Sequence, residues 1–195
     1  MFTGIIENKG KVKNISRKQN GANLAIEIIG GGPTFKSGGS VAVNGTCLTI
    51  TDFKDNTFFV DVVKDTLSRT NLSTLRRGDI VNIEFPMKLG DRLEGHIVEG
   101  HIDGMGRITS IIKSGTQCSL KIKIPDNLTR YIVKNGSVSI DGISLTVKEI
   151  MGNILGITLI PFTIENTNLK LLRVGDSVNI EVDRMGKYVE KQLNV

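Results

Sequence analysis

The sequence has only two histidines and two cysteines, the side chains that most readily do proton-transfer and nucleophilic chemistry near neutral pH. Both histidines, His96 and His101, lie in one ten-residue stretch, GHIVEGHIDG, at residues 95–104. An imidazole titrates near neutral pH, so it is suited to carrying protons. A thiol at Cys47 and a hydroxyl at Ser144 lie elsewhere in the chain. Together these groups can support proton transfer and the addition of a nucleophile.

Each of these side chains also has a structural interpretation. His101 can be a hydrogen-bonded histidine at a strand end, and His96 can likewise serve only the fold. Cys47 can be a small buried apolar side chain, and Asp183, just past an expected strand, can cap a turn. The sequence around Cys118 does not indicate a functional site. Two histidines five residues apart plus a thiol lack the ligand pairs of a zinc site, so we expect no metal.

An internal duplication relates the candidate residues to one another. Residues 4–10 resemble residues 100–106, at an offset of 96 positions. One inserted residue later the offset becomes 97, and GDIVNIE at 78–84 matches GDSVNIE at 175–181. Agreement over the whole length in nearly constant register indicates a tandem duplication.

The two copies differ where the reactive groups lie. Three aligned pairs are chemically unlike: Ile5 and His101, Cys47 and Ser144, Pro86 and Asp183. Matched pockets with unequal chemistry are what a protein needs to hold two molecules of one ligand type in different roles.

The elements that position these residues are expected to be strands. Apolar residues alternate at period two in short segments of both copies, which is typical of strands with one buried face. Asn44-Gly and Asp141-Gly are tight hairpin-turn signals. About six strands per copy would leave exposed edges in a flat sheet, and closure removes them. We therefore predict an all-β fold of two tandem six-stranded antiparallel β-barrels, at 1–96 and 97–186, and a C-terminal helical tail at 187–195.

Short helices are expected between the strands. One is predicted near residues 65–75 with Asp65 as its N-cap, and its counterpart near residues 162–172. A further helical turn is predicted after Pro125, with Asp126 as cap. The tail has apolar residues at helical spacing, and so short a helix must pack on its own barrels or on neighbouring subunits.

Composition excludes several classes of function. The formal net charge is +5, but Lys and Arg are scattered, Trp is absent and there are two Tyr. We therefore expect no nucleic-acid partner. No apolar run approaches the length of a membrane span and no signal peptide is evident, so we expect no membrane partner and a cytoplasmic location.

Four motifs, taken in order, are highly specific as a set. They are MFTGIIE at 1–7, VNGTCLT at 43–49, GDRLEGHIVEGHIDG at 90–104 and IDGISLTV at 140–147. The chain resembles, over its whole length and including the duplication, the riboflavin synthase family of the α-chain type.

The resemblance implies a transferase reaction at the end of riboflavin biosynthesis. Two molecules of 6,7-dimethyl-8-ribityllumazine exchange a four-carbon unit and give riboflavin and 5-amino-6-ribitylaminouracil. The resemblance also implies that no metal or redox cofactor is needed. It further implies a homotrimer in which the N-terminal barrel of one subunit faces the C-terminal barrel of another.

The resemblance also implies the residues of two substrate pockets. The N-terminal pocket would use Gly4, Ile5, Ile6, Cys47, Leu48, Thr49, Asp61, Val62, Val63, Lys64, Asp65 and Thr66. The C-terminal pocket would use Gly100, His101, Ile102, Ser144, Leu145, Thr146, Leu159, Ile160, Pro161, Phe162, Thr163 and Ile164. The polar set tied to turnover would be Cys47, His101, Ser144, Thr146 and Asp183. One position departs from the family, because Asn135 stands where the family has a ligand-contacting Lys.

The resemblance leads to a hypothesis for the chemistry. One lumazine loses a proton from its 7-methyl group while the other accepts a nucleophile at C7. Cys47, or a water that it and Ser144 position, is a candidate for the addition. His101 is a candidate proton carrier, and Asp183 a candidate to hold one ring. Two other functions are alternatives: a non-catalytic lumazine- or flavin-binding antenna protein of the same fold, and a barrel module that binds RNA or a partner protein.

Overall fold

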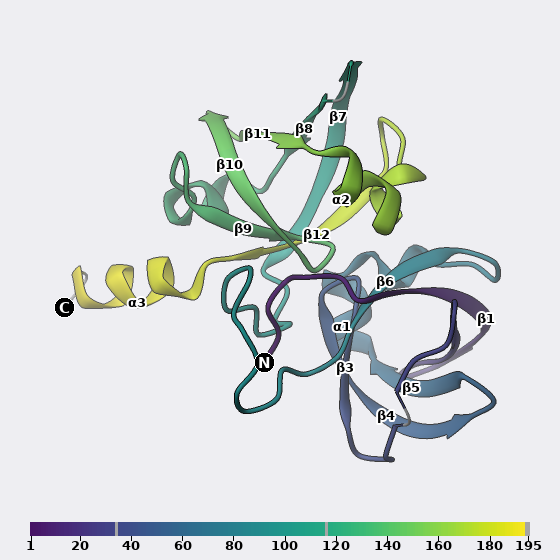
Figure 1. The fold of residues 1–195 in the computed structure, drawn as a ribbon. Helices are drawn as coiled ribbons and strands as arrows, with labels where there is room; N and C mark the ends of the chain where they lie inside the picture. Colours follow the sequence, from purple (N-terminus) through teal and green to yellow (C-terminus); the bar gives the residue numbers. More distant parts are fainter. Residues whose placement is uncertain (34, 116, 194–195) are drawn as a thin grey trace.

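The computed structural model describes residues 1–33, 35–115 and 117–193, which form two closed barrels of six antiparallel strands (Figure 1). This confirms the predicted fold class. The elements of the first copy are β1 (Asn8–Lys18), β2 (Gly21–Ile28), β3 (Ser40–Val43), β4 (Thr46–Lys54), β5 (Thr57–Val63), α1 (Lys64–Arg69), the 3₁₀ helix η1 (Asn71–Thr74) and β6 (Ile80–Glu84). Those of the second copy are β7 (Gly104–Ser114), β8 (Gln117–Lys123), η2 (Asp126–Tyr131), β9 (Ser137–Ile140), β10 (Ile143–Met151), β11 (Ile154–Leu159), α2 (Pro161–Asn166), η3 (Asn168–Lys170), β12 (Ser177–Val182) and α3 (Arg184–Leu193).

Both barrels have the same strand order. The first runs β1-β2-β5-β4-β3-β6 and closes by pairing β6 with β1. The second runs β7-β8-β11-β10-β9-β12 and closes by pairing β12 with β7. Each barrel encloses its own apolar core, so the duplicated sequence folds into two copies of one structural unit.

Period-two alternation decides which side chains are available outside each barrel. In β4, Leu48 is buried in the barrel core, whereas its neighbours Cys47 and Thr49 lie on the outer face. In β10 the pattern repeats, with Ser144 and Thr146 on the outer face. The candidate polar groups of both copies therefore lie on equivalent outer surfaces, away from the cores.

Helices occur at both predicted positions, but each is broken in two. An extended residue, Thr70 or Thr167, separates the α-helix of each copy from a following 3₁₀ turn. The prediction of Asp65 as N-cap was wrong, because Val63 precedes the helix and Asp65 lies inside it. The Asp65 carboxylate instead pairs with Arg69 one turn later, at 3.1 Å.

The predicted cap of the turn after Pro125 was also wrong. Pro125 itself is the residue before η2, and Asp126 is the first helical residue. The Asp126 carboxylate accepts a hydrogen bond from Asn153 Nδ2 at 2.8 Å. The Asp126 carboxylate thus binds a side chain of a neighbouring turn and does not cap the helix.

A short arm precedes each barrel, at residues 2–6 and 98–102. The two arms pair with each other, because Phe2 N donates to Val98 O at 2.7 Å and Val98 N donates to Phe2 O at 3.0 Å. Phe2 and Val98 are both fully buried and pack with Ala42 and Cys47. The arms therefore meet at the boundary between the barrels.

The tail helix α3 begins at Arg184 and projects from the second barrel (Figure 1, yellow). Its apolar side chains are exposed: Met185, Tyr188, Val189 and Leu193. Residues 194–195 of the predicted tail lie outside the described residues. Among the described residues, no helix combines the length and apolar character needed to cross a lipid bilayer.

Candidate active site

Two equivalent hairpins carry the candidate groups. The β3–β4 turn has positive φ at Asn44 (44°) and Gly45 (75°), and the β9–β10 turn has positive φ at Asp141 (47°) and Gly142 (83°). These values are those of the tight hairpin turn that the sequence predicts. A Cβ on Gly45 would lie 2.6 Å from the backbone nitrogen of Gly142, so the turns meet tip to tip between the barrels.

The arms cross over to the opposite hairpins. Gly4 O accepts a hydrogen bond from Ser144 N at 2.8 Å, and Gly100 O accepts one from Cys47 N at 2.9 Å. The arm before the first barrel thus lies on the second barrel, and the arm before the second barrel lies on the first. The predicted pockets grouped Gly4 with Cys47 and Gly100 with Ser144, whereas these hydrogen bonds join Gly4 to Ser144 and Gly100 to Cys47. The repeat register identifies equivalent residues but does not show which of them touch.

The arm glycines allow this close contact. Gly4 and Gly100 have φ of 77° and 81°, which is favourable for glycine alone. A Cβ on Gly4 would lie 2.7 Å from Ser144 Cβ, and one on Gly100 would lie 2.5 Å from Cys47 Cβ. Any side chain at either position would push the arm off its hairpin.

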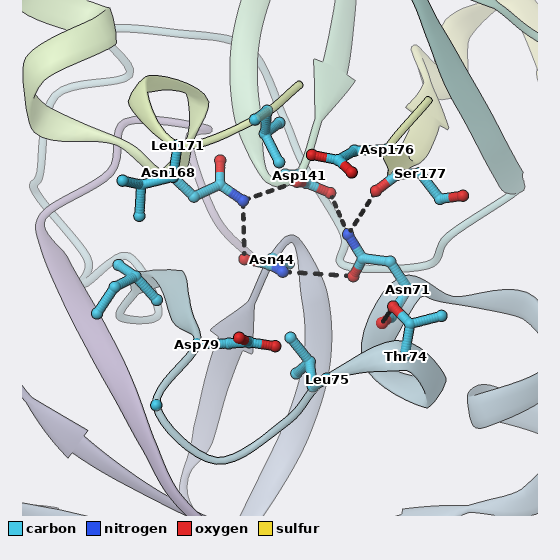
Figure 2. Close-up of a pocket in the computed structure, with 13 residues that line it drawn as sticks. Asn44, Asn71, Thr74, Leu75, Asp79, Asp141, Asn168, Leu171, Asp176 and Ser177 are labelled. Atoms are coloured by element: carbon cyan, nitrogen blue, oxygen red, sulfur yellow. Dashed lines mark hydrogen bonds between the residues drawn. The ribbon is translucent and has the colours of Figure 1, made fainter. Parts of the chain in front are cut away.

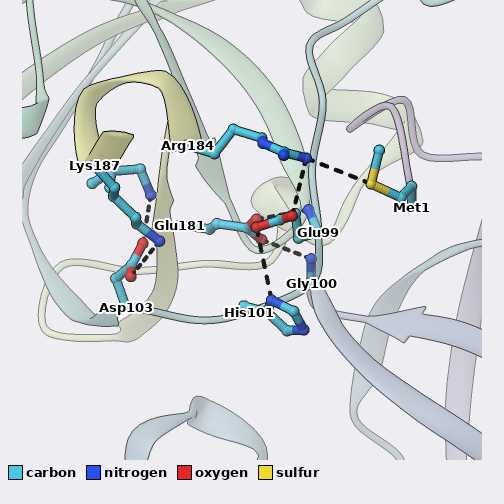
Figure 3. A network of polar contacts seen from close by, with 9 residues as sticks. Met1, Glu99, Gly100, His101, Asp103, Glu181, Arg184 and Lys187 are labelled. Carbon is cyan, nitrogen blue, oxygen red and sulfur yellow. Dashed lines mark hydrogen bonds and ion pairs between the residues drawn. The ribbon is translucent and has the colours of Figure 1, made fainter. Parts of the chain in front are cut away.

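The first site is built around Cys47. Burial raises the pKa of the half-buried Cys47 thiol, although a hydrogen bond with Ser40 and the positive chain terminus oppose the shift. The group is therefore a neutral thiol near pH 7. The His101 side chain, next to Gly100 in the arm, is 74% exposed, and its Nδ1 lies 3.8 Å from Glu99 Oε2 (Figure 3).

The second site is built around Ser144. Its hydroxyl lies 2.7 Å from His96 Nδ1, a hydrogen bond whose direction depends on the imidazole tautomer. Burial lowers the pKa of His96, opposed by the negative charge of Asp183, so the ring is neutral near pH 7. The His96 backbone nitrogen donates to Thr3 O at 3.1 Å, which joins the linker, residues 85–97 between β6 and the second arm, to the first arm.

His96 was not among the residues predicted for either pocket, yet its ring contacts Ser144. The duplication offers no equivalent for it, since the offset of 96 would fall before Met1. The available signal was its place in the same ten-residue stretch as His101. The linker wraps back beside the first arm, and only that path brings the imidazole to Ser144.

The Asp183 side chain makes a hydrogen bond within its own turn. Its Oδ1 accepts a hydrogen bond from Met185 N at 2.9 Å at the start of α3. The same carboxylate acts electrostatically on His96. Thr146 lies on the outer face two residues beyond Ser144, with Ser137 as its strand partner. Asp183 and Thr146 thus flank the second site.

The other predicted pocket residues divide by the direction of their side chains. Four face the barrel cores and can meet a ligand on the outer face only through their backbone: Leu48, Val62, Leu145 and Leu159. The segments where β5 meets α1 and β11 meets α2 are largely exposed, with Val63 at 60% and Phe162 at 72%. Asn135 has φ of 64° in the turn before β9, and its backbone nitrogen donates to Val147 O at 2.8 Å.

A polar cavity of about 380 Å³ lies between the barrels (Figure 2). Two residue pairs related by the repeat line it, Asn44 and Asp141, Asn71 and Asn168. A third pair, Asn82 and Asn179, is hydrogen-bonded to them, through Asn82 Nδ2 to Asn168 Oδ1 and Asn179 Nδ2 to Asn71 Oδ1. Asp141 is fully buried and accepts hydrogen bonds from Asn179 N, Asn71 Nδ2 and Asn168 Nδ2 at 2.7, 2.9 and 2.7 Å. Burial raises its pKa to about 7 despite these bonds. The network joins the two barrels and holds the hairpin tips in register.

These features define a class of tandem-barrel protein with twin hairpin sites. The sequence signature described as "Lumazine binding domain" matches twice, at residues 3–86 and 99–183. The chain belongs to the lumazine-binding domain family.

Relatives that match over the whole chain identify the family more specifically. The chain is 42% identical over 193 residues to the riboflavin synthase of Actinobacillus pleuropneumoniae, covering 99% of this chain and 90% of that protein. It is 42% identical to the riboflavin synthase of Mycobacterium tuberculosis, covering 98% and 97% of the two chains. The riboflavin synthase of Bacillus subtilis is 39% identical and is covered to 90% of its length, with all of this chain aligned. Within the lumazine-binding proteins, this chain is a member of the riboflavin synthase family, a family of enzymes.

Solved structures of a related protein agree on the fold. LumP complexed with riboflavin superposes with a TM-score of 0.86 at 26% identity, covering 94% of this chain and 100% of that one. LumP complexed with 6,7-dimethyl-8-(1′-D-ribityl)lumazine superposes with a TM-score of 0.83, covering 94% and 99%.

Proposed function

We propose that this chain converts two molecules of 6,7-dimethyl-8-ribityllumazine into riboflavin and 5-amino-6-ribitylaminouracil by transfer of a four-carbon unit. The observation that carries the proposal is 42% identity over 99% of the chain to a riboflavin synthase. The two hairpin sites support it, because their backbones match while their reactive groups differ. The antenna alternative is less well supported, since the LumP structures are only 26% identical.

Each hairpin would hold one lumazine on its outer face. The proposed pockets keep the residues that the family resemblance implies, with the arms exchanged: Gly100 and His101 serve Cys47, and Gly4 and Ile5 serve Ser144. Holding two reactants in the productive orientation contributes up to ~7–11 kcal/mol to lowering the barrier. Orientation is therefore the main contribution that the fold makes to the reaction.

The protonation states favour water over thiolate in the addition step. Cys47 is a neutral thiol near pH 7 because burial raises its pKa. A neutral thiol can hold a water by a hydrogen bond, while a thiolate would be the stronger direct nucleophile. We propose that Cys47 and Ser144 position the water that adds at C7 of one lumazine.

Proton transfer would use the two imidazoles differently. His101 is exposed on its arm and can exchange protons with solvent, which suits a carrier. His96 is half-buried, neutral and hydrogen-bonded to Ser144, which suits a base with one fixed partner. Asp183, beside the second site, would hold one ring or tune His96.

A complete site is proposed to need more than one subunit. The tail helix presents exposed Met185, Tyr188, Val189 and Leu193, which an assembly would cover. Thr49 and Thr146, on the outer faces of the hairpins, are likewise exposed and could meet a second barrel. We propose a homotrimer in the cytoplasm, with ligand-binding units at 1–96 and 97–186 and a tail at 187–195, requiring no cofactor, nucleic acid or membrane.

Mixing the purified chain with 6,7-dimethyl-8-ribityllumazine tests the activity directly. Growth of the riboflavin absorption band, with equimolar 5-amino-6-ribitylaminouracil, is the expected result. Stable fluorescence of bound lumazine without riboflavin formation would identify an antenna protein instead. Sedimentation of the full chain with and without ligand tests the trimer.

A further inference from the structure

We infer that Glu181 and Glu84 are positioning residues, each of which holds the arm that completes the ligand site on the opposite barrel. The inference rests on the proposed function, because it assigns roles within the two lumazine sites. Neither glutamate was a sequence-based candidate. Both lie at the last strand of their barrel and are buried, with exposed fractions of 4% and 3%.

Glu181 belongs to the second barrel but acts on the first. Its Oε1 accepts a hydrogen bond from Glu99 N at 2.7 Å, and its Oε2 accepts one from Gly100 N at 3.0 Å (Figure 3). Gly100 O then accepts the hydrogen bond from Cys47 N. One carboxylate in β12 is therefore connected to the Cys47 hairpin of β4 through a single residue.

Glu84 makes the mirror connection from the first barrel to the second. It accepts hydrogen bonds from Thr3 N at 2.6 Å and Gly4 N at 3.1 Å. Gly4 O accepts the hydrogen bond from Ser144 N. A carboxylate in β6 thus reaches the Ser144 hairpin of β10 by the same two steps.

At Glu181 only an acceptor with two oxygens satisfies this geometry, whereas at Glu84 Oε1 alone accepts from both Thr3 N and Gly4 N. Two consecutive backbone N–H groups point at the same buried side chain, and an unpaired buried N–H is costly. Glutamine has the same shape but replaces one oxygen by a donor. At Glu181, where each oxygen takes one N–H, the amide would keep one bond and lose the other.

The arm contact links these carboxylates to the reacting groups. Gly100 packs so closely on Cys47 that a Cβ would lie 2.5 Å from Cys47 Cβ, so the arm covers one side of the thiol. The next residue is His101, whose placement follows from that of Gly100. Glu181 also acts on the Cys47 thiol through its charge, raising its pKa. The charges facing Glu181 are those of Asp103 and Lys187, with Arg184 paired to Glu99 nearby.

Cysteine alkylation tests the assignment without relying on turnover. The probe is iodoacetamide, and the rates at Cys47 and Cys118 are followed by mass spectrometry in the full chain. Cys118 is 4% exposed and reports global opening. Rates are taken over a range of pH, so that thiolate accessibility is separated from any change in pKa.

Glu181→Gln and Glu84→Gln form a matched pair. Glu181→Gln is expected to raise the plateau alkylation rate of Cys47 by about 2- to 13-fold, the factor that one lost hydrogen bond gives. Glu84→Gln should raise that rate less, because the arm that Glu84 holds meets Cys47 through Phe2 and not through a hydrogen bond. An equal rise in both variants, or no rise in Glu181→Gln while Cys118 stays protected, would overturn the inference. If Glu181→Gln exposes Cys118, Glu181→Asp replaces it with the same expected and contrary results.

Lumazine titration distinguishes failure of this inference from failure of the proposed function. In the unmodified chain, riboflavin formation and lumazine binding test the function alone. In the variants, Glu181→Gln should weaken one class of bound lumazine and Glu84→Gln the other. Normal riboflavin formation with an unchanged pattern of site affinities in both variants contradicts the positioning roles and leaves the function standing.

Discussion

The Cys47 and Ser144 sites share a backbone and differ in chemistry. In each, a glycine carbonyl of a crossed arm accepts the hairpin N–H, at 2.9 Å for Cys47 and 2.8 Å for Ser144. In each, a buried glutamate holds the arm. The Cys47 site adds an exposed imidazole, His101, whereas the Ser144 site adds a half-buried one, His96. Duplication has kept the backbone of the two sites and has changed the side chains around them.

The difference is also electrostatic. Partial burial keeps the Cys47 thiol protonated and the His96 ring unprotonated near pH 7, so both half-buried groups are neutral. His101, by contrast, lies where solvent can supply or remove a proton. The imidazole of the first site is therefore exposed to water, whereas that of the second is held by a hydrogen bond to Ser144.

Replacing His101 is expected to lower activity more than replacing His96 or any other residue considered below. His101→Gln should lower kcat by about 10²- to 10⁴-fold, the usual contribution of a proton carrier. His96→Gln is the matched variant and should lower kcat less, since an amide can keep a hydrogen bond to Ser144. Riboflavin absorption gives kcat, and lumazine titration checks that binding survives. Equal losses would mean that the two sites share the proton chemistry.

A change at Gly100 tests the contact between arm and hairpin that both sites share. Gly100→Ala puts a methyl group against Cys47 in a backbone conformation with φ of 81°, and should cost roughly 10²-fold in turnover by misplacing the arm. Gly78→Ala is the control, because Gly78 also has positive φ (98°) but no neighbour within 4 Å among the described residues. Its turnover should stay near normal. A similar loss in both would mean that backbone strain, and not arm contact, matters.

Asn44 and Asp141 occupy equivalent positions in the hydrogen-bond network between the barrels, but only Asp141 has a carboxyl group. Since burial raises the pKa of Asp141 to about 7 from an ordinary 3.8, the folded chain binds more protons than the unfolded chain between those values. The Asp141 contribution is therefore stabilising at low pH and is lost as pH rises through about 7, at no more than about 1.4 kcal/mol per pH unit.

Asp141→Asn puts an asparagine at both equivalent positions. It should remove the pH dependence of the free energy of unfolding that Asp141 contributes. Urea unfolding at several pH values measures it as the difference between the variant and the parent chain. Relative to the parent chain, the variant should gain stability as pH rises from about 4 to about 7. A difference that is flat across this range would show that Asp141 does not titrate there.

The smallest expected effect concerns the thiol. Cys47→Ser gives the first hairpin the hydroxyl of the second and should lower turnover by less than about tenfold if water is the nucleophile, because a hydroxyl can still hold it. Steady-state riboflavin formation measures the change. A loss beyond about 10³-fold would instead assign the addition to a thiolate.

Much of the fold was predictable because its signals are local. Alternation at period two placed the strands, and the Asn44 and Asp141 turns have the positive φ values that their Gly-containing sequences indicate. Helix caps were less predictable: Asp65 pairs with Arg69 and Asp126 with Asn153, because a carboxylate takes whichever donor the folded neighbourhood offers. The family resemblance identified Cys47, His101 and Ser144 as site candidates, but their grouping needed the path of the arms.

The duplication, the twin barrels and the unequal pairs can be read from the sequence, because repeat register and side-chain alternation are properties of the chain in one dimension. The crossing of the arms, the contact of His96 with Ser144 and the bonds from the arms to Glu84 and Glu181 become visible in three dimensions alone. Those contacts join residues as much as 140 positions apart, such as Gly4 and Ser144. They depend on how two closed barrels are oriented about their shared boundary, which no local pattern encodes.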